Sequence, residues 1–191
     1  MGRWEPGARE RLVLAAVDLF GEQGFDETTV AQIAERAGVT KSTFFRHFPD
    51  KRELLVAGQE ALSALMTEGI AAAPDDAGPL QAVAAGLDRA SSMMGPLNRE
   101  LAPRVAAAVA ASAELQERNA LKSVGLASAM GSALIRRGVP EPTAALAAEL
   151  GVLAFKRAFA EWLESDEGSD ELAHRARVAL DELRAATASL S

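Results

Sequence analysis

Residues 28–51 constrain the fold of this chain more than any other stretch, because they read as two short helices joined by a tight turn. The first helix is predicted by apolar residues that recur at the spacing of one helical face: Val30, Ile33, Ala34 and Ala37. Gly38 predicts the end of that helix, since glycine adopts the left-handed conformation of a helix C-terminus at little cost. Thr40 is a favourable N-cap for the next helix.

The second of these helices has two chemically different faces. Phe44 and Phe48 lie four residues apart and share one face, and Pro49 ends the helix. The other side is predicted to carry small, polar and cationic residues flanked by two aromatic ones: Ser42, Thr43, Arg46, Phe45 and His47. A short helix with one apolar face and one polar, cationic face suits the major groove of DNA.

Residues 9–55 resemble the DNA-binding domain of the TetR family of bacterial transcriptional regulators. The resemblance rests on five ordered segments followed by Lys51: AAVDLF at 15–20, GF at 24–25, TTV at 28–30, IAERAGV at 33–39 and TFFRHF at 43–48. It implies a set of DNA-contacting residues: Thr29, Thr40, Lys41, Ser42, Thr43, Phe45, Arg46, His47 and Lys51. The family usually has tyrosine where Phe45 stands, and the tyrosine hydroxyl contacts a DNA phosphate. Phe45 can pack there but cannot donate that hydrogen bond.

The charge distribution fits this resemblance. The 191-residue chain has a net charge of −7, which by itself argues against nucleic acid. Between Arg36 and Arg52, however, five cations accompany one acid, Asp50, and give a local net charge of +4. Salt screens the negative charges that lie far from the bound DNA. The DNA phosphates therefore interact mainly with the nearby positive charges.

The rest of the chain predicts an all-α protein of about nine helices. Alanine is abundant, aromatic residues are only 5%, and no strand pattern occurs, which together favour closely packed helices. We expect a three-helix, helix-turn-helix DNA-binding domain at residues 1–50 and a helical ligand-binding and dimerisation domain at residues 51–191. Asp50 is a candidate N-cap for a long helix that reaches about Ala73 and connects the two domains.

The resemblance also implies an effector cavity and a dimer interface in the second domain. The candidate cavity lining is Leu62, Met66, Met93, Met94, Met130, Phe155 and Phe159. Methionine adapts to flexible apolar ligands, but each of these residues taken alone also reads as ordinary core. The family pairs its last two helices into a four-helix bundle, and the candidate interface is Leu146, Leu150, Leu153, Leu172, Leu180 and Leu183.

These features together predict a dimeric, ligand-responsive transcriptional repressor that binds palindromic operator DNA. Residues 98–163 resemble the ligand domains of actinobacterial regulators related to the mycofactocin regulator. That similarity implies a small hydrophobic effector, such as a long acyl-CoA. We expect no cofactor, no metal site and no membrane contact, and a cytoplasmic location, because the chain has no cysteine, two distant histidines and no long apolar run.

Two other functions remain open at this point. An effectorless or architectural DNA-binding protein would use its second domain only to dimerise, and the absence of a cavity would distinguish it. A helical enzyme is the alternative from another class. The chain has no tyrosine or cysteine and few histidines, and no nucleophile stands beside a base, so the sequence offers no catalytic constellation.

Overall fold

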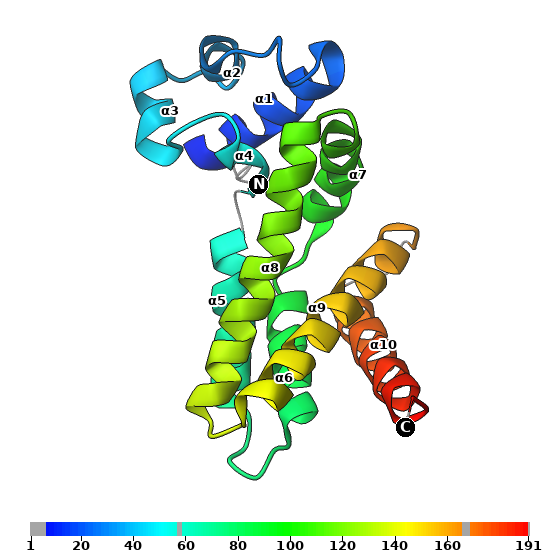
Figure 1. Ribbon diagram of the computed structural model, residues 1–191. Coiled ribbons are helices and arrows are strands. Elements are labelled where there is room, and N and C mark those ends of the chain that lie inside the picture. The colour runs from blue at the N-terminus through cyan, green and yellow to red at the C-terminus, as the bar shows by residue number, and fades with distance from the viewer. Residues whose placement is uncertain (1–6, 57–58, 166–168, 191) are drawn as a thin grey trace, which may run out of the picture. The chain divides into compact units, whose positions relative to one another are not determined.

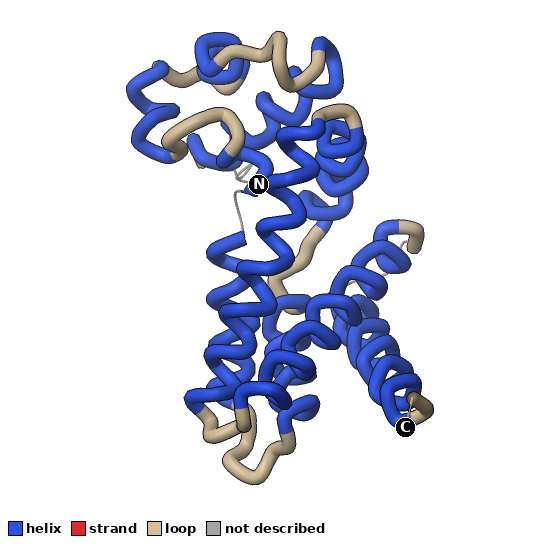
Figure 2. Tube along the Cα trace, in the orientation of Figure 1, coloured by secondary structure: helices blue, strands red, loops and turns tan. Residues whose placement is uncertain are grey.

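The computed structural model describes residues 7–56, 59–165 and 169–190, and the helical fold class is confirmed: these residues contain helices and no strand (Figures 1 and 2). The helices are α1 Ala8–Gln23, α2 Val30–Arg36, α3 Lys41–His47, α4 Glu53–Val56, α5 Gln59–Ala72, α6 Pro79–Ser91, α7 Pro96–Ala110, α8 Ala113–Arg136, α9 Glu141–Leu163 and α10 Ser169–Ala188.

Ten helical segments are described where about nine were expected. The difference lies in the connecting helix predicted between Asp50 and Ala73, which is described as α4 and α5. Residues 57–58 between them are outside the described part of the chain. Asp50 does cap the start of α4, because its Oδ1 accepts hydrogen bonds from the backbone N–H groups of Arg52 at 2.8 Å and Glu53 at 3.2 Å.

The chain packs as two compact units. The first contains residues 1–57 and 100–120, and the second contains residues 58–99 and 121–191. Residues 100–120, which the sequence analysis placed in the second domain, thus pack with the first. Apolar burial is the physical reason, because Ala108 of α7 and Leu115 of α8 are buried in the same core as the helices of the predicted DNA-binding domain.

The core of the first unit collects one apolar stripe from each of α1, α2 and α3. Leu12 and Phe20 come from α1, Ile33 from α2 and Phe44 from α3, and all are buried. The Phe20 and Phe25 rings lie 5.1 Å apart, which closes the core at the end of α1. Three helices this short bury little apolar surface by themselves, so the addition of α7 and α8 enlarges a core that would otherwise be small.

Ion pairs join the same elements at the surface of the first unit. Arg104 of α7 pairs with Asp18 of α1. Two more pairs, at 3.2 Å and 3.1 Å, connect the region of α4 to α8: Arg52 with Glu114, and Arg118 with Glu53. Because these side chains are partly exposed to solvent, each pair adds little stability, and the buried residues remain the main link.

In the second unit, α5 and α6 approach so closely that glycine is required at their contact. A Cβ added to Gly69 would lie 2.5 Å from the Ala85 carbonyl oxygen, and one added to Gly86 would lie 2.7 Å from the Met66 carbonyl oxygen. Helices α9 and α10 pack against each other and against α6. The shared core contains Met66, Met130 and Trp162.

Arg137 fastens the end of α8 to the end of α5. Its guanidinium donates hydrogen bonds to the carbonyl oxygens of Ala73 at 2.9 Å and Pro74 at 2.5 Å, and a longer one to Ala71 at 3.4 Å. The last carbonyl groups of a helix have no partner within the helix. Arg137 therefore satisfies polar groups that the C-terminus of α5 leaves open.

We expect Arg137→Met to lower the free energy of unfolding by about 2 kcal/mol, because charged hydrogen bonds to three carbonyl groups are lost while the apolar stem is kept. Urea denaturation followed by circular dichroism measures the change. Arg136→Met is the matched control, since Arg136 is the exposed neighbour at the end of α8 and should shift stability by less than about 0.5 kcal/mol. Equal losses in the two variants would contradict this role for Arg137.

Candidate nucleic-acid interface

The local structure of α2, the turn and α3 follows from a few capping residues. Thr29 caps α2, where its Oγ1 accepts a hydrogen bond from the Gln32 N–H while the Gln32 side chain accepts one from the Thr29 N–H. Gly38 lies in the turn with φ of +66°, a conformation that disfavours other residues. Thr40 caps α3 by accepting the Thr43 N–H at 3.1 Å. The predicted caps and turn are thus present.

Helix α3 is oriented by the burial of its aromatic face. Phe44 and Phe48 are buried, with ring centroids 5.8 Å apart. Four predicted contact residues are consequently exposed on the remaining surface of α3: Lys41, Ser42, Phe45 and Arg46. Thr43 and His47 are half-buried, so they lie at the edges of that surface. We call these six residues the reading face.

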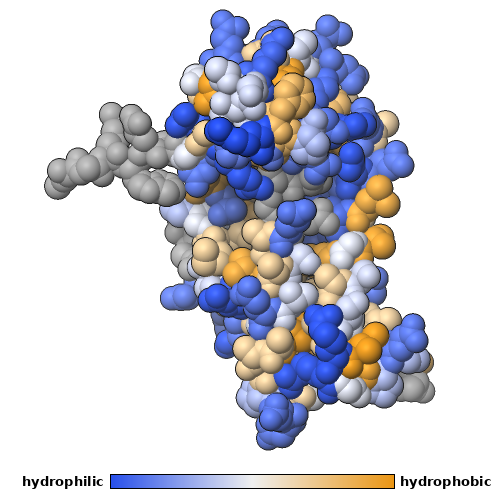
Figure 3. Space-filling model, turned by 90° about the vertical axis from the view of Figure 1, so that its left-hand side faces the viewer, coloured by the Kyte–Doolittle hydropathy of each residue, from blue (hydrophilic) through white to orange (hydrophobic). Residues whose placement is uncertain are grey.

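Phe45 stands out on the reading face because 56% of its surface is exposed. The centroids of the Phe45 and Phe44 rings lie 5.3 Å apart in a T-shaped arrangement. Figure 3 looks onto the side of the molecule on which α3 lies in Figure 1, and the upper part of that surface is mostly hydrophilic with several hydrophobic patches among it. An aromatic ring exposed among polar residues is available to pack against a sugar–phosphate backbone.

The hydroxyl groups of Thr29 and Thr40 are already used within the protein. Both residues are exposed, but the Thr29 hydroxyl contacts the Gln32 side chain at 2.9 Å, and the Thr40 hydroxyl lies 3.1 Å from that of Thr43. Their first task is therefore to start α2 and α3. Their predicted contacts with DNA remain predictions, and each would have to form in addition to the cap.

Lys51 has a structural role that the sequence did not reveal. Its Nζ donates hydrogen bonds to the carbonyl oxygens of Phe25 at 2.6 Å, Thr28 at 2.9 Å and Asp26 at 3.2 Å, and it lies 4.3 Å from the centre of the Phe25 ring. An ammonium group has three donors. Lys51 therefore fixes the connection between α1 and α2, and its predicted phosphate contact stays a prediction.

The local charge of +4 is smaller in effect than the sequence suggests, because two of its five cations are paired. Arg36 makes a two-bond ion pair with Glu22, at 2.8 Å and 2.9 Å. Arg52 bonds to Asp50, and that hydrogen bond lowers the pKa of the Asp50 carboxyl, so the carboxylate persists. Within the described residues, Lys41 and Arg46 form no ion pair. These two cations dominate the field of the reading face.

The predicted effector-binding residues separate into three groups in the second unit. Met66, Met130 and Phe155 are buried in the core, while Leu62, Met94 and Phe159 are partly buried against it. Met93 lies apart from that core, because it follows the last turn of α6 and 62% of its surface is exposed; its predicted effector contact stays a prediction. The structure thus brings six of the seven residues to one cluster.

The predicted dimer residues also divide, because burial within one protomer competes with burial between two. Leu146 and Leu153 of α9 are 55% and 51% exposed, and Leu150 and Leu183 are partly buried. Leu172 and Leu180 are buried in the core of the second unit, so their burial does not depend on a partner, and their predicted place in a dimer interface stays a prediction. Val178 of α10, which the sequence analysis did not name, is also an exposed apolar residue.

Comparison with known proteins identifies the class to which this geometry belongs. Residues 12–57 match the sequence profile described as "Bacterial regulatory proteins, tetR family". The chain is 39% identical to the transcriptional regulator TcmR of Streptomyces glaucescens over 75 residues, which are 39% of this chain and 33% of TcmR. It is 35% identical to RutR of Escherichia coli over 77 residues, which are 40% of this chain and 36% of RutR. The match therefore spans about a third of the length of these curated relatives.

Solved structures share the fold over nearly the whole chain. SmeT, in a complex with triclosan, is 24% identical with a TM-score of 0.59, and the match covers 94% of this chain and 90% of SmeT. NalD, the secondary repressor of the MexAB-OprM multidrug efflux pump in Pseudomonas aeruginosa, is 23% identical with a TM-score of 0.56, covering 92% and 96%. The helix-turn-helix region at residues 12–57 thus matches the TetR family of bacterial regulatory proteins, and the solved structures share the fold of nearly the whole chain.

We expect Lys51→Met to weaken the first unit even without DNA, by about 1–3 kcal/mol, because three carbonyl groups lose their donor. Amide hydrogen exchange in α1 and α2 measures this local loss. Lys41→Met removes an exposed cation of the reading face and serves as the matched control. Unchanged exchange in the Lys51 variant would contradict the structural role, and greater loss in the control would contradict the division of roles.

Proposed function

We propose that this protein is a dimeric transcriptional repressor that binds palindromic operator DNA in the cytoplasm and is released by a small hydrophobic effector. The reading face of α3 is the observation that carries this proposal. Phe44 and Phe48 hold the helix against the core, and the exposed remainder offers two unpaired cations, a hydroxyl and a ring. This is the surface that a recognition helix presents to a major groove.

The residues of the reading face are proposed to make different kinds of contact with DNA. Arg46 extends from the middle of the exposed surface and can bond to a base edge or a phosphate, while Lys41 at the start of α3 is suited to the backbone. The backbone N–H groups at the start of α3 also favour a phosphate. Phe45 supports docking by packing alone, since it has no hydroxyl.

The dimer is proposed to form through the exposed side of α9 and α10. Leu146 and Leu153 lie seven residues apart on α9, and Val178 is exposed on α10. In a dimer with two-fold symmetry about these helices, each protomer would present one reading face, and each reading face would bind one half-site of the operator. Half-sites one helical turn apart would place the two recognition helices about 34–36 Å apart.

The effector is proposed to enter at the accessible edge of the apolar cluster in the second unit. Leu62, Met94 and Phe159 are partly buried against this cluster, and Met66 and Met130 within it have side chains flexible enough to move aside. The lining is apolar, which favours a hydrophobic effector, and a long acyl-CoA remains within this class. The effector must bind more tightly to the arrangement of the dimer that does not bind DNA. An effector with equal affinity for the two arrangements would not change their populations.

Two helices link such a change to the reading face. Helices α7 and α8 each contain residues of both units, and Ala108 and Leu115 from them lie in the core of the first unit. A shift of either helix therefore disturbs packing directly behind α1 and α3. Coupling of about 1–3 kcal/mol would lower DNA affinity by a factor of about 5–150.

Footprinting on the DNA upstream of the protein's own gene tests DNA binding. We expect a protected palindrome, and Arg46→Ala should reduce affinity about tenfold or more because a charge-assisted hydrogen bond to DNA is lost. Arg36→Ala is the control, since Arg36 already pairs with Glu22 outside the reading face. Protection of a single asymmetric half-site by a monomer, or equal effects of the two variants, would refute the proposal.

Release from DNA is tested separately. DNA binding that no hydrophobic ligand or acyl-CoA releases would favour the architectural alternative.

We expect Leu153→Glu to separate the dimer, because it introduces a charge into an apolar interface. Analytical ultracentrifugation should show a monomer at concentrations where the unmodified protein is dimeric. Leu121→Glu is the matched control, since Leu121 is 59% exposed on α8, outside α9 and α10. A dimer that survives Leu153→Glu, or that Leu121→Glu disrupts equally, would place the interface elsewhere.

A further inference from the structure

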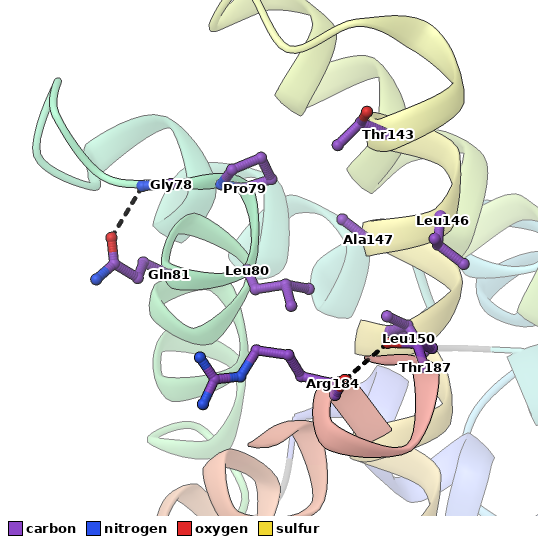
Figure 4. A pocket seen from close by; sticks show the side chains of 10 residues that line it. All are labelled: Gly78, Pro79, Leu80, Gln81, Thr143, Leu146, Ala147, Leu150, Arg184 and Thr187. Carbon is purple, nitrogen blue, oxygen red and sulfur yellow. Dashed lines mark hydrogen bonds between the residues drawn. The ribbon is translucent and has the colours of Figure 1, made fainter. Parts of the chain in front are cut away.

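A pocket of about 400 Å³ opens in the second unit between the first turn of α6, the first half of α9 and the last turns of α10 (Figure 4). Its volume lies within the range of small-molecule sites. None of the residues predicted to bind the effector lines it. It is therefore a different site from the one proposed for the effector, although its inner wall packs against the same core.

The inner walls of this pocket are apolar. Leu80 reaches in from α6, and Leu146, Ala147 and Leu150 form the wall on α9, as Figure 4 shows. Three of these residues lie within or against the core, so the wall has a fixed shape. An aliphatic or aromatic group would gain by leaving water for this surface.

The polar side of the pocket carries a single charge among its lining residues, the guanidinium of Arg184 on α10. Arg184 pairs with Asp181 at 3.3 Å, but both side chains are well exposed, and such pairs contribute little. The Thr187 hydroxyl donates a hydrogen bond to the Arg184 carbonyl at 2.8 Å, so it is used within α10. The guanidinium is thus free to exchange its partner for an anion that approaches from the pocket.

The start of α6 adds to the same preference. Gly78 and Pro79 line the pocket, and the Gly78 N–H is satisfied by the Gln81 side chain at 2.9 Å. The positive end of the α6 dipole lies on the side of the pocket that those residues form, and it favours negative charge there. The helix dipole and the positive charge of Arg184 therefore both favour an anion in this pocket.

We propose that this pocket is a second small-molecule site, which binds a small amphipathic carboxylate with its apolar body against Leu80 and Leu150 and its carboxylate at Arg184. This goes beyond the proposed function and does not depend on DNA binding. Leu146 and Leu150 also belong to the proposed dimer surface, so occupancy of the pocket would be felt at that surface. A second copy of the chain is the competing occupant.

Calorimetry with sodium octanoate on the full chain tests the site, with 1-octanol as an uncharged probe of similar length. We expect octanoate to bind and Arg184→Gln to weaken it about tenfold, because a charge-assisted hydrogen bond is lost, while octanol is unaffected. Arg136→Gln, which removes an exposed cation from the end of α8, is the control and should change neither probe. Equal octanoate affinity in the Arg184 variant and the unmodified protein would overturn the proposal.

Thr143→Phe tests the pocket itself, because Thr143 is exposed at the pocket wall in the first turn of α9 and phenylalanine would fill the space. It should abolish binding of both probes while thermal unfolding and oligomeric state stay unchanged. If no octanoate binds to the unmodified protein and Thr143→Phe breaks the dimer, a second copy occupies the pocket and the proposal fails. A gel shift with operator DNA tests the proposed repressor function separately from the proposed carboxylate site. Octanoate can still bind to a protein that binds no operator.

Discussion

Phe44 enters the core of the first unit from one side of α3 and thereby decides which side chains of that helix face the solvent. With Phe48 one turn later, it fixes the rotation of α3 about its own axis. The exposure of Lys41, Phe45 and Arg46 follows from that rotation. The same core receives Ala108 and Leu115, so the orientation of the reading face and the attachment of α7 and α8 depend on one body of buried apolar surface.

Much of this could be predicted from the sequence, because the helix-turn-helix is specified locally. Phe44 and Phe48 at a spacing of four, glycine at position 38 and threonine at position 40 each act within one turn of the chain, and the structure confirms all of them. Periodicity also predicted the helical class. What local signals could not predict is which distant segment completes the core of the first unit, and the predicted boundary at residues 50 and 51 therefore did not include residues 100–120 in it.

What the sequence could not resolve at the proposed sites has one physical cause. A leucine stripe on a helix looks the same whether it packs within a protomer or against a partner, so Leu172 and Leu180 could not be told from Leu146 and Leu153. Met93 reads as apolar in sequence, although its position just beyond the last turn of α6 leaves it in solvent. Lys51 shows the same limit for charge, since three backbone carbonyl groups that gather only in the folded chain engage its ammonium group.

The surroundings of Trp162 give this protein an optical property. The chain has two tryptophans and no tyrosine, and Trp162 is buried in the second unit with the Phe159 ring 5.6 Å away and the Arg99 guanidinium 4.1 Å above its own ring. Trp4 lies outside the described residues. A protein in which Trp4 is replaced by phenylalanine would emit tryptophan fluorescence from one site alone. Its wavelength and intensity would then follow the packing of the second unit without labelling, while the first unit remained spectroscopically silent.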